Sequence, residues 1–140
     1  MFRKIMIPVD LGHVEALERA LQVGADLAGH YGAEVHYVSV TGTAPSKIAH
    51  SPEEFREKLN RFAAAEAEAR SIASTHAHTV ISHDPSVDMD HQLCEAMDEI
   101  GADLVVMGSH IPHWYEFGSH GGKLAAHAHC SVMIVRDDTR

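Results

Sequence analysis

One stretch near the C-terminus constrains the fold more than any other, because it alternates buried-strand and glycine patterns. Asp103–Met107 is a short continuous apolar run, which is typical of a strand buried on both faces. Glycines follow at Gly108 and again over Gly118–Gly122, after which Lys123–His129 has helical spacing and Ser131–Val135 is a second apolar run. A glycine turn between a strand and a helix N-terminus presents unpaired backbone N–H groups, which bind anions. The stretch therefore predicts an α/β fold with an anion site beside its glycines.

The rest of the chain repeats this alternation. Apolar residues recur at steps of three and four in the expected helices, while the expected strands are short and rich in β-branched residues. We expect strands at 5–10, 34–40 and 76–82, and helices at 14–30, 51–74 and 89–100, with a loop at 83–88. Five strands alternating with four helices predict a three-layer sandwich with a parallel sheet and helices on both faces. We expect a single domain over residues 1–140.

Composition excludes several classes of partner. The formal net charge is −9, with 20 acidic and 11 basic side chains. This acidic balance argues against nucleic acid or an anionic membrane as the main partner, although backbone amides can still hold a phosphate. Cys94 and Cys130 form no Cys-x-x-Cys pattern, and no apolar run reaches transmembrane length. We expect a reduced, cytoplasmic protein without membrane insertion.

A ligand should lie outside the carboxyl ends of the strands, where the strand order reverses. Three segments bound that crevice if the first and fourth strands are neighbours: Pro8–Leu11, Val40–Gly42 and Met107–Gly121. Asp10 ends the first strand, where its carboxylate has two interpretations, as an acceptor for ribose hydroxyls or as the N-cap of the next helix. The first turn, Asp10–His13, lacks the dinucleotide glycine fingerprint, and the chain has no P-loop sequence. A phosphate site would therefore depend on the later glycines.

Four segments together give the whole chain a resemblance to the universal stress protein family. They are Ile5–Asp10, Gly101–His110, Gly118–Ser119 and Ala128–Arg136, in the family's order and spacing. The resemblance implies a flavodoxin-like sheet of strand order 3-2-1-4-5. It also implies a homodimer that pairs through its last strand and a regulatory protein of the stress response.

ATP-binding members of that family carry Gly-x2-Gly-x9-Gly-Ser/Thr after the fourth strand. Gly108 matches the first glycine of this pattern, and Gly118 with Ser119 matches its last pair. The resemblance implies that ATP or AMP binds, with Mg²⁺ accompanying the nucleotide. Asp10 and the backbone of Val40 would meet the adenosine, while the later residues would surround the phosphates. The full set implied is Pro8, Val9, Asp10, Val40, Met107, Gly108, His110, Gly118, Ser119, His120 and Gly121.

The phosphate loop departs from the family pattern. Ile111 replaces the second glycine, Pro112 removes a backbone donor, and the segment before Gly118 is three residues shorter. Gly121 stands where members often supply a hydroxyl. The shortened segment carries the bulky side chains of Trp114, Tyr115 and Phe117, which leads to an alternative hypothesis. In that alternative the protein is a nucleotide-free dimeric interaction module whose aromatic loop occupies the phosphate site.

The remaining candidate sites are weaker. The closely spaced histidines His110 and His113, with His120, His127 and His129 after them, have no cysteine or acid at a recognised metal-binding spacing. We expect these to be surface histidines, and we assign no metal site. No nucleophile and base are placed to predict dedicated catalysis, so we expect a protein that is not an enzyme, apart from weak incidental ATP hydrolysis.

Overall fold

A computed structural model describes residues 1–109 and 126–136. Five parallel strands form one sheet of order β3-β2-β1-β4-β5. The strands are β1 (Lys4–Pro8), β2 (Glu34–Thr41), β3 (Thr75–Ile81), β4 (Leu104–Ser109) and β5 (Ser131–Arg136). The expected α/β architecture, with its all-parallel sheet and 3-2-1-4-5 order, is therefore confirmed.

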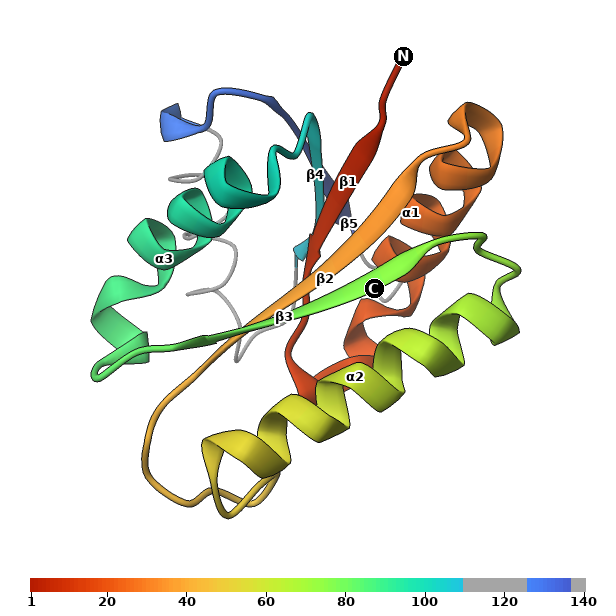
Figure 1. The fold of residues 1–140 in the computed structure, drawn as a ribbon. Helices are drawn as coiled ribbons and strands as arrows, with labels where there is room; N and C mark the ends of the chain where they lie inside the picture. Colours follow the sequence, from red (N-terminus) through yellow and green to blue (C-terminus); the bar gives the residue numbers. More distant parts are fainter. Residues whose placement is uncertain (110–125, 137–140) are drawn as a thin grey trace.

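The sheet lies between helices on its two faces (Figure 1). The helices are α1 (Glu18–Tyr31), α2 (Pro52–Ala69) and α3 (Pro85–Ile100), with a 3₁₀ helix, η1 (Leu11–Leu17), before α1. Figure 1 shows α1 and α2 on one face and α3 on the other. Within the described residues there are three α-helices rather than four. Of the expected helix at 123–129, residues 126 and 127 are helical, 128 and 129 are not, and the rest lies outside the described residues.

The sheet separates two hydrophobic cores, one on each of its faces. Ile5 and Ile7 of β1 pack with Leu21 of α1 and Leu59 of α2, whereas Met6 packs with Leu93 of α3. These side chains are almost completely buried, because strand residues alternate between the two faces. Helix α1 lies so close to β1 that a Cβ at Gly24 would come within 2.4 Å of the Ile7 Cδ1 atom.

Local backbone chemistry explains where the expected element ends were wrong. Helix α2 begins as expected, with the Ser51 hydroxyl accepting from the Glu54 N–H at 3.1 Å, but it ends at Ala69. Ser71 there has a left-handed backbone (φ 56°), which stops the helix. Helix α3 begins at Pro85, inside the expected 83–88 loop, because proline suits the first helical position.

The expected helix at 14–30 is also wrong in its first turn, which is 3₁₀ and begins at Leu11. The Asp10 carbonyl accepts from the His13 N–H at 3.0 Å, a contact that closes a three-residue turn. The α-helical part ends at Tyr31, where Gly32 takes a left-handed conformation (φ 66°). None of the helices in residues 1–109 and 126–136 combines the length and the apolar character needed to cross a membrane.

Arg70 joins the two helices that cover the first face. Its guanidinium donates to Glu66 of α2 at 2.8 Å and, across the interface, to Glu18 of α1 at 2.8 Å and Gln22 at 2.7 Å. The Arg70 side chain is only 10% exposed and that of Glu66 12%, so the bond between them is shielded from water, whereas Glu18 is 68% exposed. The hydrogen bond from Arg70 lowers the pKa of the Glu18 carboxyl.

We expect Arg70→Ala to lower the free energy of unfolding by about 1–3 kcal/mol, because it leaves the largely buried Glu66 carboxylate without its partner, while Glu18 and Gln22 can bond to water. Arg61→Ala is the matched control, since Arg61 is 74% exposed and lies 3.8 Å from Glu57. Its loss should cost less than about 0.5 kcal/mol. Urea unfolding followed by circular dichroism measures both, and equal losses would show that the Arg70 network does not hold α1 to α2.

Candidate functional site

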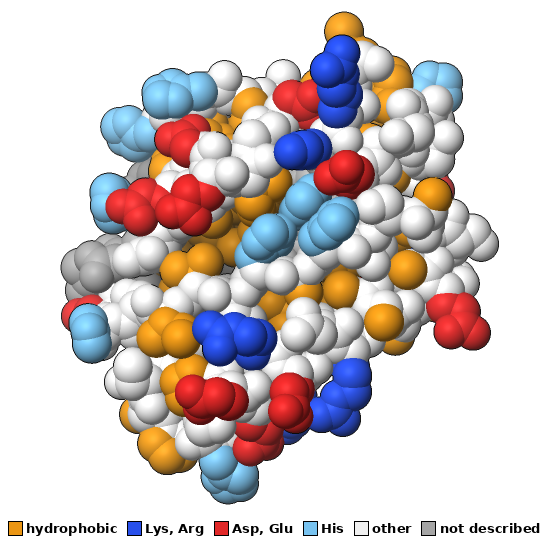
Figure 2. All heavy atoms as spheres, in the orientation of Figure 1, with side chains coloured by type: hydrophobic (Ala, Val, Ile, Leu, Met, Phe, Trp, Pro, Cys, Tyr) orange, Lys and Arg blue, Asp and Glu red, His pale blue; other side chains and the backbone are white. Residues whose placement is uncertain are grey.

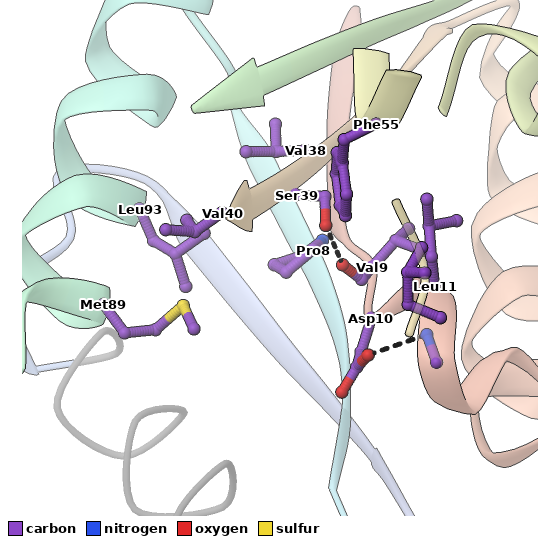
Figure 3. A pocket seen from close by; sticks show the side chains of 12 residues that line it. Pro8, Val9, Asp10, Leu11, Val38, Ser39, Val40, Phe55, Met89 and Leu93 are labelled. Atoms are coloured by element: carbon purple, nitrogen blue, oxygen red, sulfur yellow. Dashed lines mark hydrogen bonds between the residues drawn. The ribbon is translucent and has the colours of Figure 1, made fainter. Parts of the chain in front are cut away.

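A cavity of about 150 Å³ lies at the carboxyl edge of β1 and β2 (Figure 3). This edge is where the chain leaves the sheet for η1 and for the loop before α2, so several segments converge there. The residues that line the cavity are Pro8, Val9, Asp10, Leu11, Gly12, Val38, Ser39, Val40, Ile48, Phe55, Met89 and Leu93. The site is therefore built by both faces of the molecule around the end of the central strand.

Most of the cavity wall is apolar. Phe55 from α2 lies on one side, and Met89 and Leu93 from α3 lie on the other (Figure 3). Ile48 comes from the loop before α2, where the Ser46 hydroxyl accepts from its N–H at 3.2 Å and Lys58 donates to its carbonyl. An apolar wall with few polar groups is the usual character of a small-molecule site.

Asp10 supplies the carboxylate of the cavity. Its Oδ1 accepts from the Gly12 N–H at 2.9 Å, and its Oδ2 lies 3.3 Å from the His13 Nδ1 atom. The N-cap interpretation of Asp10 is therefore observed. Because each carboxylate oxygen can accept more than one hydrogen bond and the side chain is 34% exposed, Asp10 can still accept from a ligand.

Ser39 holds the ends of the two strands together. Its hydroxyl donates to the Val9 carbonyl at 2.7 Å, and the Val9 N–H donates to the Val38 carbonyl at 2.8 Å. The backbone bond continues the β1–β2 pairing one residue past β1, and Figure 3 shows the Ser39 hydroxyl bonded to Val9 beside it. With Ser39 only 3% exposed, the floor of the cavity is fixed before any ligand arrives.

The structure brings four of the expected site residues together and separates two. Pro8, Val9, Asp10 and Val40 line the cavity. Met107 is fully buried in the α3-side core, and Gly108 is buried against α1 rather than lining this cavity. The other expected residues, His110, Gly118, Ser119, His120 and Gly121, lie outside the described residues.

Leu11 lines the cavity too, and it belongs to the Pro8–Leu11 segment that was expected to bound the crevice. Sequence reasoning missed the seven other lining residues, which are Gly12, Val38, Ser39, Ile48, Phe55, Met89 and Leu93. A signal existed for some of them. Ile48 is an isolated large aliphatic residue in a polar loop, and Phe55 and Leu93 stand at apolar positions with helical spacing. The sequence does not show that these side chains meet at one strand end.

Comparison with known proteins decides the family. The family model described as the universal stress protein family matches residues 1–136. The chain belongs to this family. Universal stress protein G of Shigella flexneri is 29% identical over 97% of this chain and 100% of its own length.

Solved universal stress proteins share the fold. One, in complex with cAMP, is 19% identical with a TM-score of 0.70, covering 96% of this chain and 97% of its own. The universal stress protein from Archaeoglobus fulgidus in complex with dAMP is 21% identical with a TM-score of 0.65, covering 94% and 96%. At this level of identity the likeness establishes the architecture.

Gly108 has a packing role that its place in the universal stress protein pattern does not reveal. A Cβ there would lie 2.9 Å from the Leu17 Cδ2 atom and 3.8 Å from the Ala20 Cβ atom. The glycine therefore lets η1 and α1 approach β4.

We expect Gly108→Ala to destabilise the fold by about 1–2 kcal/mol, because Leu17 is buried and must move. In a Leu17→Ala background the same change should cost clearly less, since the crowding atom is gone. Chemical unfolding of the four proteins in this double-mutant cycle measures the coupling. If the two stability losses are additive, contact with Leu17 is not the reason for a glycine at position 108.

Proposed function

We propose that this universal stress protein binds an adenine nucleotide, ATP or AMP, and regulates stress physiology as a cytoplasmic homodimer. The observation that carries the proposal is the apolar cavity beside the Asp10 carboxylate at the carboxyl edge of β1 and β2. The cAMP and dAMP complexes of related structures support the ligand class. Two unpaired cysteines, Cys94 and Cys130, suit a reducing compartment.

The cavity suits the adenosine half of the ligand. A purine ring is flat and largely apolar, so it fits between the side chains of α3 and those of the loop before α2. The backbone of Val40 would meet the adenine, and Asp10 would accept hydrogen bonds from the ribose hydroxyls. A charged acceptor strengthens such bonds.

The phosphates would extend from this cavity toward the end of β4. Met107 and Gly108 lie on that strand, and His110, Gly118, Ser119, His120 and Gly121 complete the proposed set. Consecutive backbone N–H groups of a glycine-rich segment hold phosphate oxygens without a basic surface, which is compatible with the net charge of −9. Mg²⁺ would bind through the phosphates rather than through a protein cage. We assign these residues to binding and none to catalysis.

We expect Asp10→Ser to weaken adenosine and ATP binding by about tenfold or more, because the charge-assisted bonds to the ribose are lost. Serine is as good an N-cap as aspartate, so the Gly12 N–H keeps a partner and stability should change by less than about 0.5 kcal/mol. Asp10→Ala removes both the ribose acceptor and the N-cap, so nucleotide affinity and stability should both fall. Calorimetric titration and thermal unfolding separate these effects.

Gly118→Val tests the phosphate half independently. This substitution should weaken the binding of ATP and AMP, which carry phosphates, and leave the affinity for adenosine unchanged. Chromatography of the supernatant from denatured protein, purified without added nucleotide, would show whether a nucleotide is retained. No heat at millimolar ATP together with no retained nucleotide would reject the proposed ligand.

A second candidate function is favoured by the size of the cavity. The space formed by the described residues, about 150 Å³, is smaller than the roughly 300–1,000 Å³ of most small-molecule sites. This favours a nucleotide-free interaction module in which the aromatic segment of Trp114, Tyr115 and Phe117 occupies the phosphate site. A micromolar affinity for ATP in the titration would rule this alternative out.

The proposed dimer pairs through β5, an edge strand of the sheet. Met133 in this strand is 39% exposed, so it leaves apolar surface open to solvent at this edge. A second copy would cover it and would satisfy the free edge of the strand.

We expect Met133→Asp to convert the dimer to a monomer, because it places a charge in the proposed interface. Ile81→Asp is the matched control, since Ile81 is 40% exposed on β3 at the opposite edge. Sedimentation velocity gives the mass of each variant. A dimer that survives Met133→Asp but not Ile81→Asp would place the interface at the other edge.

A further inference from the structure

Three histidines and a glutamate gather on β2 and β3, away from the nucleotide cavity. Glu34 and His36 belong to β2, and His76 and His78 belong to β3. His36 and His76 are partners in the parallel register, so their side chains emerge on the same face. This is the α3 face, since Met6, the register partner of His36, packs with Leu93 of α3. Figure 2 shows a group of histidine side chains at the surface.

The contacts within the group are close. The His36 Nε2 atom lies 2.9 Å from the Glu34 Oε1 atom, and the His76 Nε2 atom lies 3.7 Å from that same oxygen. The His36 and His76 rings stack, with centroids 4.4 Å apart and planes at 12°. One ligand atom from each of Glu34, His36 and His76 lies within 4.8 Å of the other two.

We propose that Glu34, His36 and His76 bind a divalent transition-metal ion of the zinc type. Zinc takes imidazole nitrogen at about 2.0–2.1 Å and carboxylate oxygen at about 2.0–2.2 Å, so neighbouring ligand atoms of a tetrahedral site are about 3.3 Å apart. The Glu34 Oε1 atom lies 2.9 Å from the His36 Nε2 atom and 3.7 Å from the His76 Nε2 atom, on either side of this value. Because the two imidazole rings are stacked, they must rotate so that a lone pair of each points at the ion. Two imidazoles and a carboxylate leave the fourth position to water.

His78 holds the buried ligand in place. Its Nε2 atom lies 2.9 Å from the His36 Nδ1 atom. A metal on the His36 Nε2 atom requires the ring proton on Nδ1, where it donates to His78, and His78 then carries its own proton on Nδ1. A metal-bound histidine usually has its second nitrogen anchored in this way.

The ligand types and their exposure suit a transition-metal ion. Burial is the main cause that lowers the pKa of both His36 and His78. Lys4 is the positive charge that acts on His36, and its ammonium donates to the Ile100 carbonyl at 3.3 Å. Glu34 and His76 are 42% and 46% exposed, which gives an ion access from solvent. Magnesium and calcium prefer oxygen ligands and do not suit this set.

No other group within the described residues meets the same proximity of three ligand atoms. His127 and His129 belong to the C-terminal histidines singled out in the sequence. Within the described residues, these two do not form such a group. His129 makes a single approach to Asp98, at 3.7 Å. The sheet, not the histidine-rich C-terminal stretch, carries the proposed metal site.

The test is a competition titration of metal-free full-length protein with Zn²⁺ and a chelator of known affinity, at pH 7.5. The wild-type chain should show one site that is weakened more than about tenfold by His76→Ala and by Glu34→Ala, with about 10–100-fold weakening by His78→Ala. Both ligands chosen for removal are half-exposed, so the fold should survive their loss. Zn²⁺ should also raise the melting temperature of the wild type and not that of His76→Ala.

His91→Ala is the matched control, because His91 is an exposed histidine 2.7 Å from Glu95 with no third ligand described beside it. It should bind Zn²⁺ within twofold of the wild type. Equal Zn²⁺ affinity in the wild type and His76→Ala, whether strong or absent, would overturn the proposal. A loss in His91→Ala alone would also overturn it, because the ion would then lie on α3.

Discussion

The burial of β1 on both faces is the constraint on which the rest of the structure depends. Ile5, Met6 and Ile7 have no solvent exposure, and they supply both cores in alternation. The Asp103 carboxylate fixes the start of the strand by accepting from the Arg3 N–H at 2.9 Å and the Lys4 N–H at 3.1 Å. The cavity lies at the carboxyl end of this strand, where η1, the loop before α2, and α2 and α3 converge around it.

The fold was predictable because its signals are redundant. Most expected strands are short apolar runs, and alternation with helices leaves few topologies open. The strand expected at 76–82 has only Val80 and Ile81 as strongly apolar residues, and its place in the alternation supports it. The strand order came from the family resemblance, and the sheet confirms it. Helix ends were less predictable, because they depend on single backbone conformations such as that of Ser71, which has no side-chain signature.

The candidate site was half predictable for a physical reason. Residues at the end of a strand, such as Asp10 and Val40, are placed by the sheet, and the sheet follows from the sequence pattern. Ile48 and Phe55 are placed by a loop and a helix start, whose approach to β1 depends on packing. Gly108 was expected to bind phosphate, but a side chain there would crowd Leu17. The sequence alone does not distinguish a glycine needed for packing from one needed for phosphate binding.

Strand β2 carries both proposed sites on one face, since alternate residues point the same way. Glu34 and His36 belong to the proposed metal site, and Val38 and Val40 line the cavity. The histidine group could not be found from the sequence, because Glu34 and His76 are far apart in the chain and only the β2–β3 register joins them. A slip of one residue would set His36 opposite Thr75 or Ala77 and turn His76 to the other face. The metal site is thus a property of the register, and an ion bound across the two strands would stabilise that register against such a slip.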